Sequence, residues 1–207
     1  NNLASMTSLV SLIEQHTNDV HQFAGDIQRR IHAMANIHDM LAETNGHTLT
    51  LRTLLARMTE QNAGRAPLCR IELEGPDVPV SQKQAVPLAL TIAELFTNSI
   101  QHGAAGVSGG SIEIRWSANR SNQAQQITLH WREQGGPSID QPPQPALGTD
   151  LIQGFINYEL AGTVQLRYPP DGVDHTLTFR LIDPDTDWPA IHVLQTKIPP
   201  AMSHQST

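Results

Sequence analysis

A carboxylate and a neutral amide stand one helical turn apart near the middle of this 207-residue chain. Glu94 and Asn98 lie within residues 81–102, whose apolar spacing predicts a long helix, so both side chains project from one face. A carboxylate beside an amide oxygen suits the orientation of an acceptor or a water molecule, and offers an oxygen ligand to a hard cation such as Mg²⁺. On an exposed helix such a pair is usually only hydrated, so its meaning depends on the residues further along the chain.

Glycines follow at two later junctions between predicted elements. A predicted strand at residues 127–131 leads into Glu133, Gly135 and Gly136, and a further predicted helix opens at Gly148. Glycine lets a backbone approach a ligand closely, and the free amides at a helix N-terminus favour phosphate. Each junction taken singly is more often an ordinary turn, so the order of the whole set along the chain carries the inference.

The elements that must position these residues fall into three segments. Residues 1–46 show apolar positions at helical spacing, which predicts a hairpin of two amphipathic helices. A lone pair of helices cannot bury its apolar stripe on both sides, so the hairpin must pack on a second copy or on the rest of the chain. A homodimer through a four-helix bundle is the favoured outcome. Residues 183–207 are polar and contain several prolines, which predicts a C-terminal extension.

Residues 47–182 alternate between helix and strand signals. They predict an α+β sandwich, with helices on one face of a mostly antiparallel sheet. In order, the segments are a helix at 51–61 capped by Thr50, a strand at 69–73, the helix at 81–102, a glycine-rich loop at 103–110, a strand at 112–116, a polar loop, a strand at 127–131, a helix at 149–160, and a hairpin of strands at 164–168 and 175–181.

The composition excludes several classes of function. There are 13 Lys and Arg against 20 Asp and Glu, a net charge of −7, which disfavours a nucleic-acid groove because such grooves need clustered cations. The single Cys69 excludes an internal disulfide and a multi-thiolate metal site, and fits the reducing conditions of the cytoplasm. No apolar stretch approaches the roughly 20 residues that a membrane-spanning helix needs, so we expect no membrane contact from these residues.

Three motifs in sequence carry a resemblance to a known family. They are Ala-Glu-Leu-Phe-Thr-Asn-Ser-Ile-Gln-His-Gly-Ala at 93–104, Trp-Arg-Glu-Gln-Gly-Gly-Pro at 131–137 and Leu-Gly-Thr-Asp-Leu-Ile at 147–152. The set resembles the Bergerat-type ATP-binding sandwich of sensor histidine kinases, and within them the subfamily defined by a Trp-x-Glu motif before its glycines. Residues 30–41 resemble the second helix of that family's phosphoacceptor hairpin, and residues 1–3 resemble the end of its acceptor box.

The resemblance implies a reaction and a set of roles. ATP and Mg²⁺ would bind the sandwich, a histidine would be autophosphorylated, and the phosphoryl group would pass to a response regulator receiver domain. Asn98 would coordinate Mg²⁺, Glu94 would polarise the acceptor histidine, and Glu133 would meet the adenine. The acceptor histidine itself is expected just upstream of Asn1. The other residues that the resemblance assigns to the nucleotide are Gln101, His102, Gly135, Gly136, Gly148, Thr149 and Leu151.

Departures from the family pattern keep two alternatives open. Gln101 stands where the family often has a lysine, and Ala146 where it usually has a glycine. A missing cation removes a charge-assisted contact to phosphate. One alternative is therefore a degenerate histidine phosphotransfer or scaffold protein that does not bind ATP. The other is an ATP-binding regulator of the anti-sigma type, which would lack the dimeric bundle.

The cations are distributed unevenly around the predicted site. No Lys or Arg lies between Lys83 and Arg115, or between Arg132 and Arg167. These gaps contain the long helix, the glycines and residues 137–147, which the resemblance implies to be a short lid. A triphosphate bound there would therefore depend on Mg²⁺ and backbone amides for most of its charge neutralisation.

Overall fold

A five-stranded sheet forms one layer of the protein. The computed structural model describes residues 20–43, 48–66, 68–121, 124–141, 143–144 and 146–182. The strands are β1 (Arg70–Glu74), β2 (Ser111–Ser121), β3 (Ala124–Gln134), β4 (Thr163–Arg167) and β5 (Gly172–Ile182). Their order in the sheet is β1-β2-β3-β5-β4. Only the β1–β2 pair is parallel, and the other neighbours are antiparallel, as the sequence predicts.

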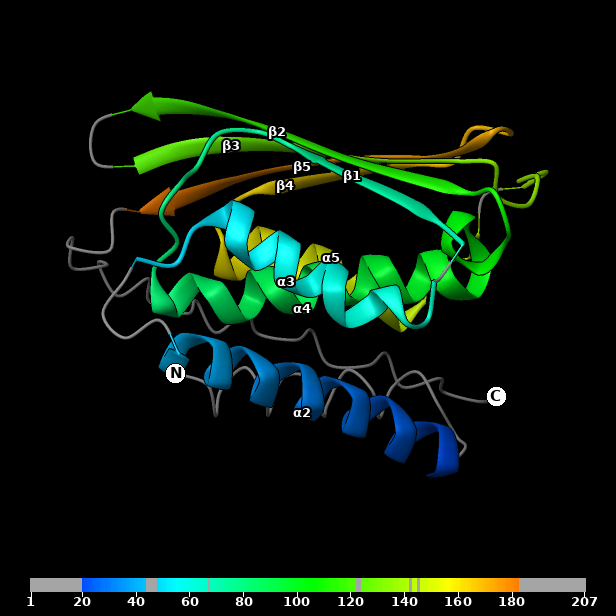
Figure 1. Ribbon diagram of the computed structural model, residues 1–207, viewed down its shortest axis with the longest axis horizontal. Coiled ribbons are helices and arrows are strands. Elements are labelled where there is room, and N and C mark those ends of the chain that lie inside the picture. The colour runs from blue at the N-terminus through cyan, green and yellow to red at the C-terminus, as the bar shows by residue number, and fades with distance from the viewer. Residues whose placement is uncertain are drawn as a thin grey trace, which may run out of the picture.

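Helices cover one face of this sheet, and a further helix lies beyond them (Figure 1). The layer next to the sheet contains α3 (Leu51–Ala63), α4 (Gln82–His102) and α5 (Leu147–Gly154), with a short 3₁₀ turn at Ala104–Gly106. The second helix of the predicted hairpin, α2 (Val20–Glu43), runs along the side of α4 that faces away from the sheet. The predicted mixed α+β architecture is therefore confirmed for the described residues.

The helix α4 is buried on most of its surface because it lies between the sheet and α2. Leu88, Ile92 and Phe96 are fully buried, as their apolar arc predicts. Thr91 and Glu94, which lie at helical spacing on the same face as Asn98, are also buried, at 0% and 8% exposure. This face of α4 is therefore buried at Thr91 and Glu94, half-buried at Asn98 and exposed at Gln101.

The predicted hairpin packs on the rest of this chain through α2. Met34, Ile37 and Met40 of α2 are buried in the same apolar cluster as α4. Packing on the rest of the chain is one of the two outcomes expected for an isolated hairpin. The first helix of the hairpin and the C-terminal extension lie outside the described residues, and the four-helix bundle remains a prediction.

Local signals predicted several element ends correctly. The helix α3 begins after Thr50, whose hydroxyl oxygen accepts a hydrogen bond from the Thr53 N–H at 3.2 Å, the usual role of an N-cap threonine. The strand β1 shows the predicted alternation of half-buried and exposed side chains.

In the part of the chain that the structure describes, no helix combines the length and apolarity needed to cross a bilayer.

Two predicted boundaries were wrong. The polar loop expected between residues 116 and 127 is mostly strand, because β2 and β3 remain paired as far as Ser121 and Ala124. Main-chain hydrogen bonds hold this hairpin together, so polar side chains do not end it. The last helix begins at Leu147 instead of Thr149 and finishes in a π-helical turn at Phe155–Glu159, where the Leu160 N–H donates to the Phe155 carbonyl at 3.0 Å.

A buried histidine on β5 packs against Tyr168. His175 is 4% exposed, and its ring meets the ring of Tyr168 edge to face at 5.1 Å. Burial lowers the pKa of His175 from 6.5 to about 4, against the opposing effect of neighbouring Asp174. The imidazole is therefore neutral in the folded protein over a range in which the unfolded chain is protonated.

We expect the protein to lose stability as the pH falls from 6.5 toward 4, because only the unfolded state gains a proton there. The full difference in pKa corresponds to about 3 kcal/mol of unfolding free energy. Urea denaturation at neutral and at mildly acidic pH measures this loss. A His175→Phe variant should lose clearly less stability on acidification than the unsubstituted protein, and an equal loss in both proteins would contradict the assignment.

Candidate active site

The C-terminal half of α4 and the N-terminus of α5 bring three predicted site residues together. A Cβ atom placed on Gly148 would lie 3.1 Å from Glu94 Oε2 and 3.3 Å from Asn98 Oδ1. Glycine at this position therefore lets the first turn of α5 approach both side chains. The first N–H groups of a helix have no partner within it, so this approach places free donors beside an amide oxygen and a carboxylate. We call Glu94, Asn98 and Gly148 the Asn98 cluster.

Glu94 has a charged partner that the motifs did not indicate. Arg30 of α2 donates from Nη2 to Glu94 Oε2 at 3.0 Å, and its Nε lies 2.9 Å from Oε1. Both side chains are nearly buried, with 7% of Arg30 and 11% of Glu94 exposed. One feature of the sequence could have indicated a buried role for Arg30. It is in helical spacing with Ile27, Met34 and Ile37, at a position where an apolar residue is expected.

A second group of residues surrounds Glu133 near the end of β3. Glu133 is 4% exposed. Its Oε2 accepts hydrogen bonds from the Ser99 hydroxyl and the Ala104 N–H, both at 2.8 Å, and its Oε1 accepts from the Trp131 indole N–H at 2.8 Å. Three donors offset the large cost of burying a carboxylate. We call Glu133, Ser99, Ala104 and Trp131 the Glu133 cluster.

Three members of the Glu133 cluster, Ser99, Ala104 and Trp131, were not predicted as site residues, and Ala104 takes part only through its backbone N–H. By helical spacing Ser99 lies on the apolar face of α4 with Ile92 and Leu95. A hydroxyl on that face was the signal in the sequence that could have indicated a buried polar contact. The Ser99 Oγ also accepts from the Ala105 N–H at 3.1 Å. Trp131 is fully buried and packs edge to face on Phe96, with ring centroids 4.9 Å apart. Trp131 is therefore a core residue that also donates a hydrogen bond to Glu133.

Glycines allow the loops around the Glu133 cluster to close on one another. A Cβ on Gly103 would collide with Glu133 Oε2. Gly135 has φ +72°, a left-handed conformation that favours glycine, and a Cβ there would lie 3.1 Å from the Gly109 carbonyl oxygen. A Cβ on Gly136 would lie 3.0 Å from the Ala104 nitrogen. The turn after β3 thus packs directly against the glycine-rich loop.

Four predicted nucleotide contacts lie outside these two clusters and outside the turn at Gly135 and Gly136. Gln101 and His102 are exposed at the end of α4. The Thr149 hydroxyl accepts from the Ala146 N–H at 3.0 Å and donates to the Ala146 carbonyl at 2.6 Å, so it stabilises the start of α5. Leu151 is 2% exposed and belongs to the core. Their contacts with a nucleotide remain predictions, as does the contact between Glu133 and adenine.

The side chains near Asn98 are suited to give Mg²⁺ one protein ligand. They are not suited to surround the ion with protein ligands alone. Among the described residues, no group of three or more His, Cys, Asp or Glu converges in a way that could hold a metal ion. Mg²⁺ is usually held by one or two protein oxygens together with waters and substrate phosphates. The half-buried Asn98 amide oxygen, beside the first turn of α5, offers a donor of this kind.

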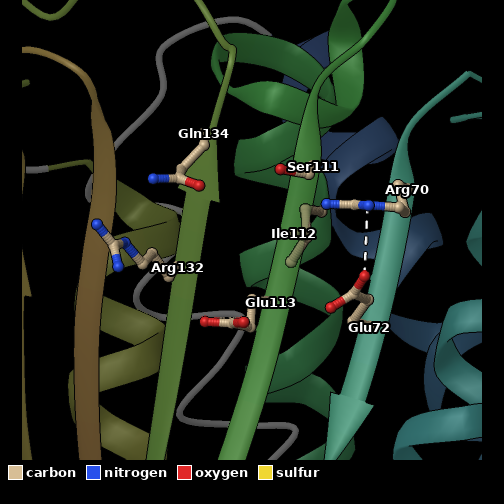
Figure 2. A pocket seen from close by; sticks show the side chains of 7 residues that line it. All are labelled: Arg70, Glu72, Ser111, Ile112, Glu113, Arg132 and Gln134. Atoms are coloured by element: carbon tan, nitrogen blue, oxygen red, sulfur yellow. Dashed lines mark ion pairs between the residues drawn. The ribbon is translucent and has the colours of Figure 1, made fainter.

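A shallow hollow on the outer face of the sheet is separate from the candidate site (Figure 2). Arg70 and Glu72, which form an exposed ion pair at 3.4 Å, stand on β1 at one side of it. The residues lining the hollow are Arg70, Glu72, Ser111, Ile112, Glu113, Arg132 and Gln134. None of them belongs to either cluster, so the hollow has no part in the site described above.

The protein has the histidine kinase catalytic-domain fold. This follows from the sheet, its helical layer and the polar clusters bordered by glycines. The solved blue-light-activated histidine kinase of Erythrobacter litoralis matches with a TM-score of 0.67 at 16% identity, covering 86% of this chain and 57% of that chain. The separate histidine kinase domain of that protein matches with a TM-score of 0.58 at 14% identity, covering 85% of this chain and 95% of that chain. At these identities the likeness concerns the fold.

The sequence comparisons narrow the class. The family model for HWE histidine kinases matches residues 1–77. Blue-light-activated histidine kinase 1 of Erythrobacter litoralis is 28% identical over 190 residues, which are 89% of this chain and 51% of that protein. The blue-light-activated histidine kinase of Brucella ovis is 27% identical over 177 residues, 84% of this chain and 35% of that protein. This chain thus spans about half the length of these relatives, or less. These matches confirm the resemblance to an HWE-type sensor histidine kinase core.

Proposed function

We propose that this chain is the catalytic core of a sensor histidine kinase that uses Mg-ATP to phosphorylate a histidine of its own hairpin. The observation that carries the proposal is the convergence of Glu94, Asn98 and Gly148 at the N-terminus of α5. The kinase names and the fold of the related proteins support it. The phosphoryl group then passes to an aspartate of a response regulator receiver domain, in the cytoplasm.

Phosphoryl transfer asks the protein mainly for positioning and charge neutralisation. Asn98 would hold Mg²⁺ through its amide oxygen, and the bound ion would supply positive charge to offset that of the phosphates. The free amides of the first turn of α5 would face the phosphates. Glu94 would accept a hydrogen bond from the imidazole of the acceptor, which is expected just upstream of Asn1, and so favour the nitrogen that attacks.

The Glu133 cluster would form the base-binding end of the site. Glu133 is the proposed partner of the adenine amino group, and the three donors that hold its carboxylate fix its position before any ligand arrives. Gly135 and Gly136 would let the backbone approach the base closely. Gln101, His102, Thr149 and Leu151 complete the set of proposed nucleotide contacts.

The hairpin would also form the dimer. Ile31 is 47% exposed on α2, although large aliphatic side chains are more often buried. An exposed isoleucine on the helix that bears the family match supports a second copy as its partner. The receiver domain would approach the same hairpin, because the phosphoryl group must pass from there.

Calorimetric titration with a non-hydrolysable ATP analogue tests the proposed function. We expect saturable binding in the presence of Mg²⁺ and a clearly lower affinity when Mg²⁺ is chelated. The segments around the site contain no Lys or Arg, so the triphosphate depends on Mg²⁺ for much of its charge neutralisation. The same titration with a guanine analogue is the matched control for base recognition. A flat titration under all conditions would contradict the proposal and favour a phosphotransfer or scaffold protein that has lost nucleotide binding.

A further inference from the structure

A buried ion pair joins α2 to the helix that carries the proposed catalytic carboxylate. The Arg30 guanidinium meets both oxygens of Glu94, at 3.0 Å to Oε2 and 2.9 Å to Oε1. The two residues are 64 positions apart in sequence. The Nη2–Oε2 contact is a hydrogen bond and the Nε–Oε1 contact is a close charge contact, so the rigid guanidinium restrains the Glu94 carboxylate at both oxygens.

The packing around Arg30 holds it firmly in this position. Ile27, Met34 and Ile37 lie on the same stripe of α2 and belong to the apolar core or pack against it. On the other side of the pair, Glu94 Oε2 lies 3.1 Å from the position of a Cβ on Gly148. The Asn98 cluster is therefore bounded on one side by α5 and on the other by an arginine from the hairpin helix.

Arg30 places a cation beside a site whose own segments contain none, and the Glu94 carboxylate balances its charge. No Lys or Arg occurs between Lys83 and Arg115 or between Arg132 and Arg167. Arg30 brings a cation into contact with the cluster from a segment far away in the chain. An apolar pair of similar volume often stabilises a buried contact as well as, or better than, an ion pair, so stability by itself does not account for the charged pair.

We propose that Arg30 is a positioning residue for the phosphoryl transfer: it orients Glu94 toward the acceptor histidine. The proposal rests on the proposed function of the chain. It makes the orientation of the catalytic carboxylate dependent on α2, so transfer is efficient only while the hairpin helix is docked on α4. Arg30 acts through Glu94 and makes no contact with the transferred group.

The test compares variants of the full-length protein, including the acceptor histidine. Arg30→Gln should slow autophosphorylation at saturating Mg-ATP by about 100-fold, the effect of a small misplacement of a reacting group. Its affinity for the ATP analogue should remain within about threefold of the unsubstituted protein, because the Glu133 cluster is untouched. Arg30→Lys keeps the charge and should recover part of the rate. Arg180→Gln, which removes an exposed cation on β5, should behave like the unsubstituted protein.

A double-substitution cycle separates positioning from folding. If Arg30 acts through Glu94, then Arg30→Gln should cause no further loss of rate in a Glu94→Gln background. Arg30→Gln leaves a buried carboxylate unpaired and should lower the stability, so circular dichroism without nucleotide must first show that every variant is folded at the assay temperature. A full labelling rate in Arg30→Gln, a faster rate, or additive losses in the double variant would each overturn the proposal. A loss of affinity for the ATP analogue in Arg30→Gln, parallel to the loss of rate, would also overturn it.

The result also distinguishes this inference from the proposed function. If the unsubstituted protein binds no ATP analogue and takes up no label, the proposed function is wrong and the role of Arg30 falls with it. If the unsubstituted protein does both and Arg30→Gln matches it, only the positioning role is wrong.

Discussion

Replacing Asn98 by alanine is expected to abolish Mg-ATP-dependent autophosphorylation of the full-length protein. The substitution removes the amide oxygen that stands beside Gly148 and the first turn of α5, and nothing on α4 replaces it. Loss of one preorganised polar contact in an active site typically slows a reaction by about 100- to 1,000-fold, and loss of a metal ligand should reach at least that range. Transfer of label from ATP to the protein, followed over time, measures the effect.

The Asn98→Ala variant should remain folded, because the side chain is only half-buried. Its urea denaturation midpoint should therefore lie close to that of the unsubstituted protein. Asn36→Ala is the matched control, since it removes an exposed asparagine from α2 and should label at the full rate. Undiminished labelling of Asn98→Ala would contradict both the metal role of Asn98 and the assignment of the site.

Replacing Glu133 by alanine should cause the largest loss of stability among the site residues. The change leaves the Ser99 hydroxyl, the Ala104 N–H and the Trp131 indole N–H without their common acceptor. Each unsatisfied buried donor costs about 1 to 3 kcal/mol, so we expect a loss of at least about 3 kcal/mol in the free energy of unfolding. Urea denaturation measures it, and analogue binding should disappear in the same variant.

Two further variants test whether the cost comes from the buried hydrogen bonds. Glu133→Gln keeps the shape of the side chain and one acceptor oxygen, so it should be less destabilising than Glu133→Ala. Glu72→Ala removes an exposed carboxylate of the same sheet, whose ion pair with Arg70 is solvated, and should cost no more than about 1 kcal/mol. A Glu133→Ala protein as stable as Glu72→Ala would rule out the proposed network.

The fold and part of the site could be predicted from local patterns. The long helix follows from its apolar spacing, and the start of α3 follows from Thr50, because both signals act within a few residues. The convergence of Glu94, Asn98 and Gly148 was predictable only through motif order. Periodicity places Glu94 and Asn98 on one face, but it does not say which element will cover that face.

Contacts between distant segments could not be predicted in the same way. Arg30 and Glu94 are 64 positions apart, and their meeting depends on how α2 docks on α4. Ser99 belongs by periodicity to the apolar arc, and its bond to Glu133 exists because β3 ends beside that arc. The extended β2–β3 hairpin was missed for another reason, since main-chain pairing carries little trace in the polar side chains.

The structure also explains the spacing within the Trp-x-Glu motif. Residues two apart on a strand point to the same side of a sheet, so Trp131 and Glu133 both face the helices. The indole ring packs on Phe96 while its N–H reaches the carboxylate at 2.8 Å. A residue inserted between them would turn one of the two toward the outer face.

The two clusters share the backbone of one helix, since Asn98 and Ser99 are neighbours in sequence yet belong to different ends of the site. Each added or deleted residue rotates the following part of an α-helix by about 100°. An insertion or deletion in α4 before residue 94 would turn both clusters together, and one between residues 94 and 98 would separate Glu94 from the rest. During divergence this stretch is therefore expected to tolerate exchanges of side chains while keeping its length fixed, whereas the loops on either side are free to change length.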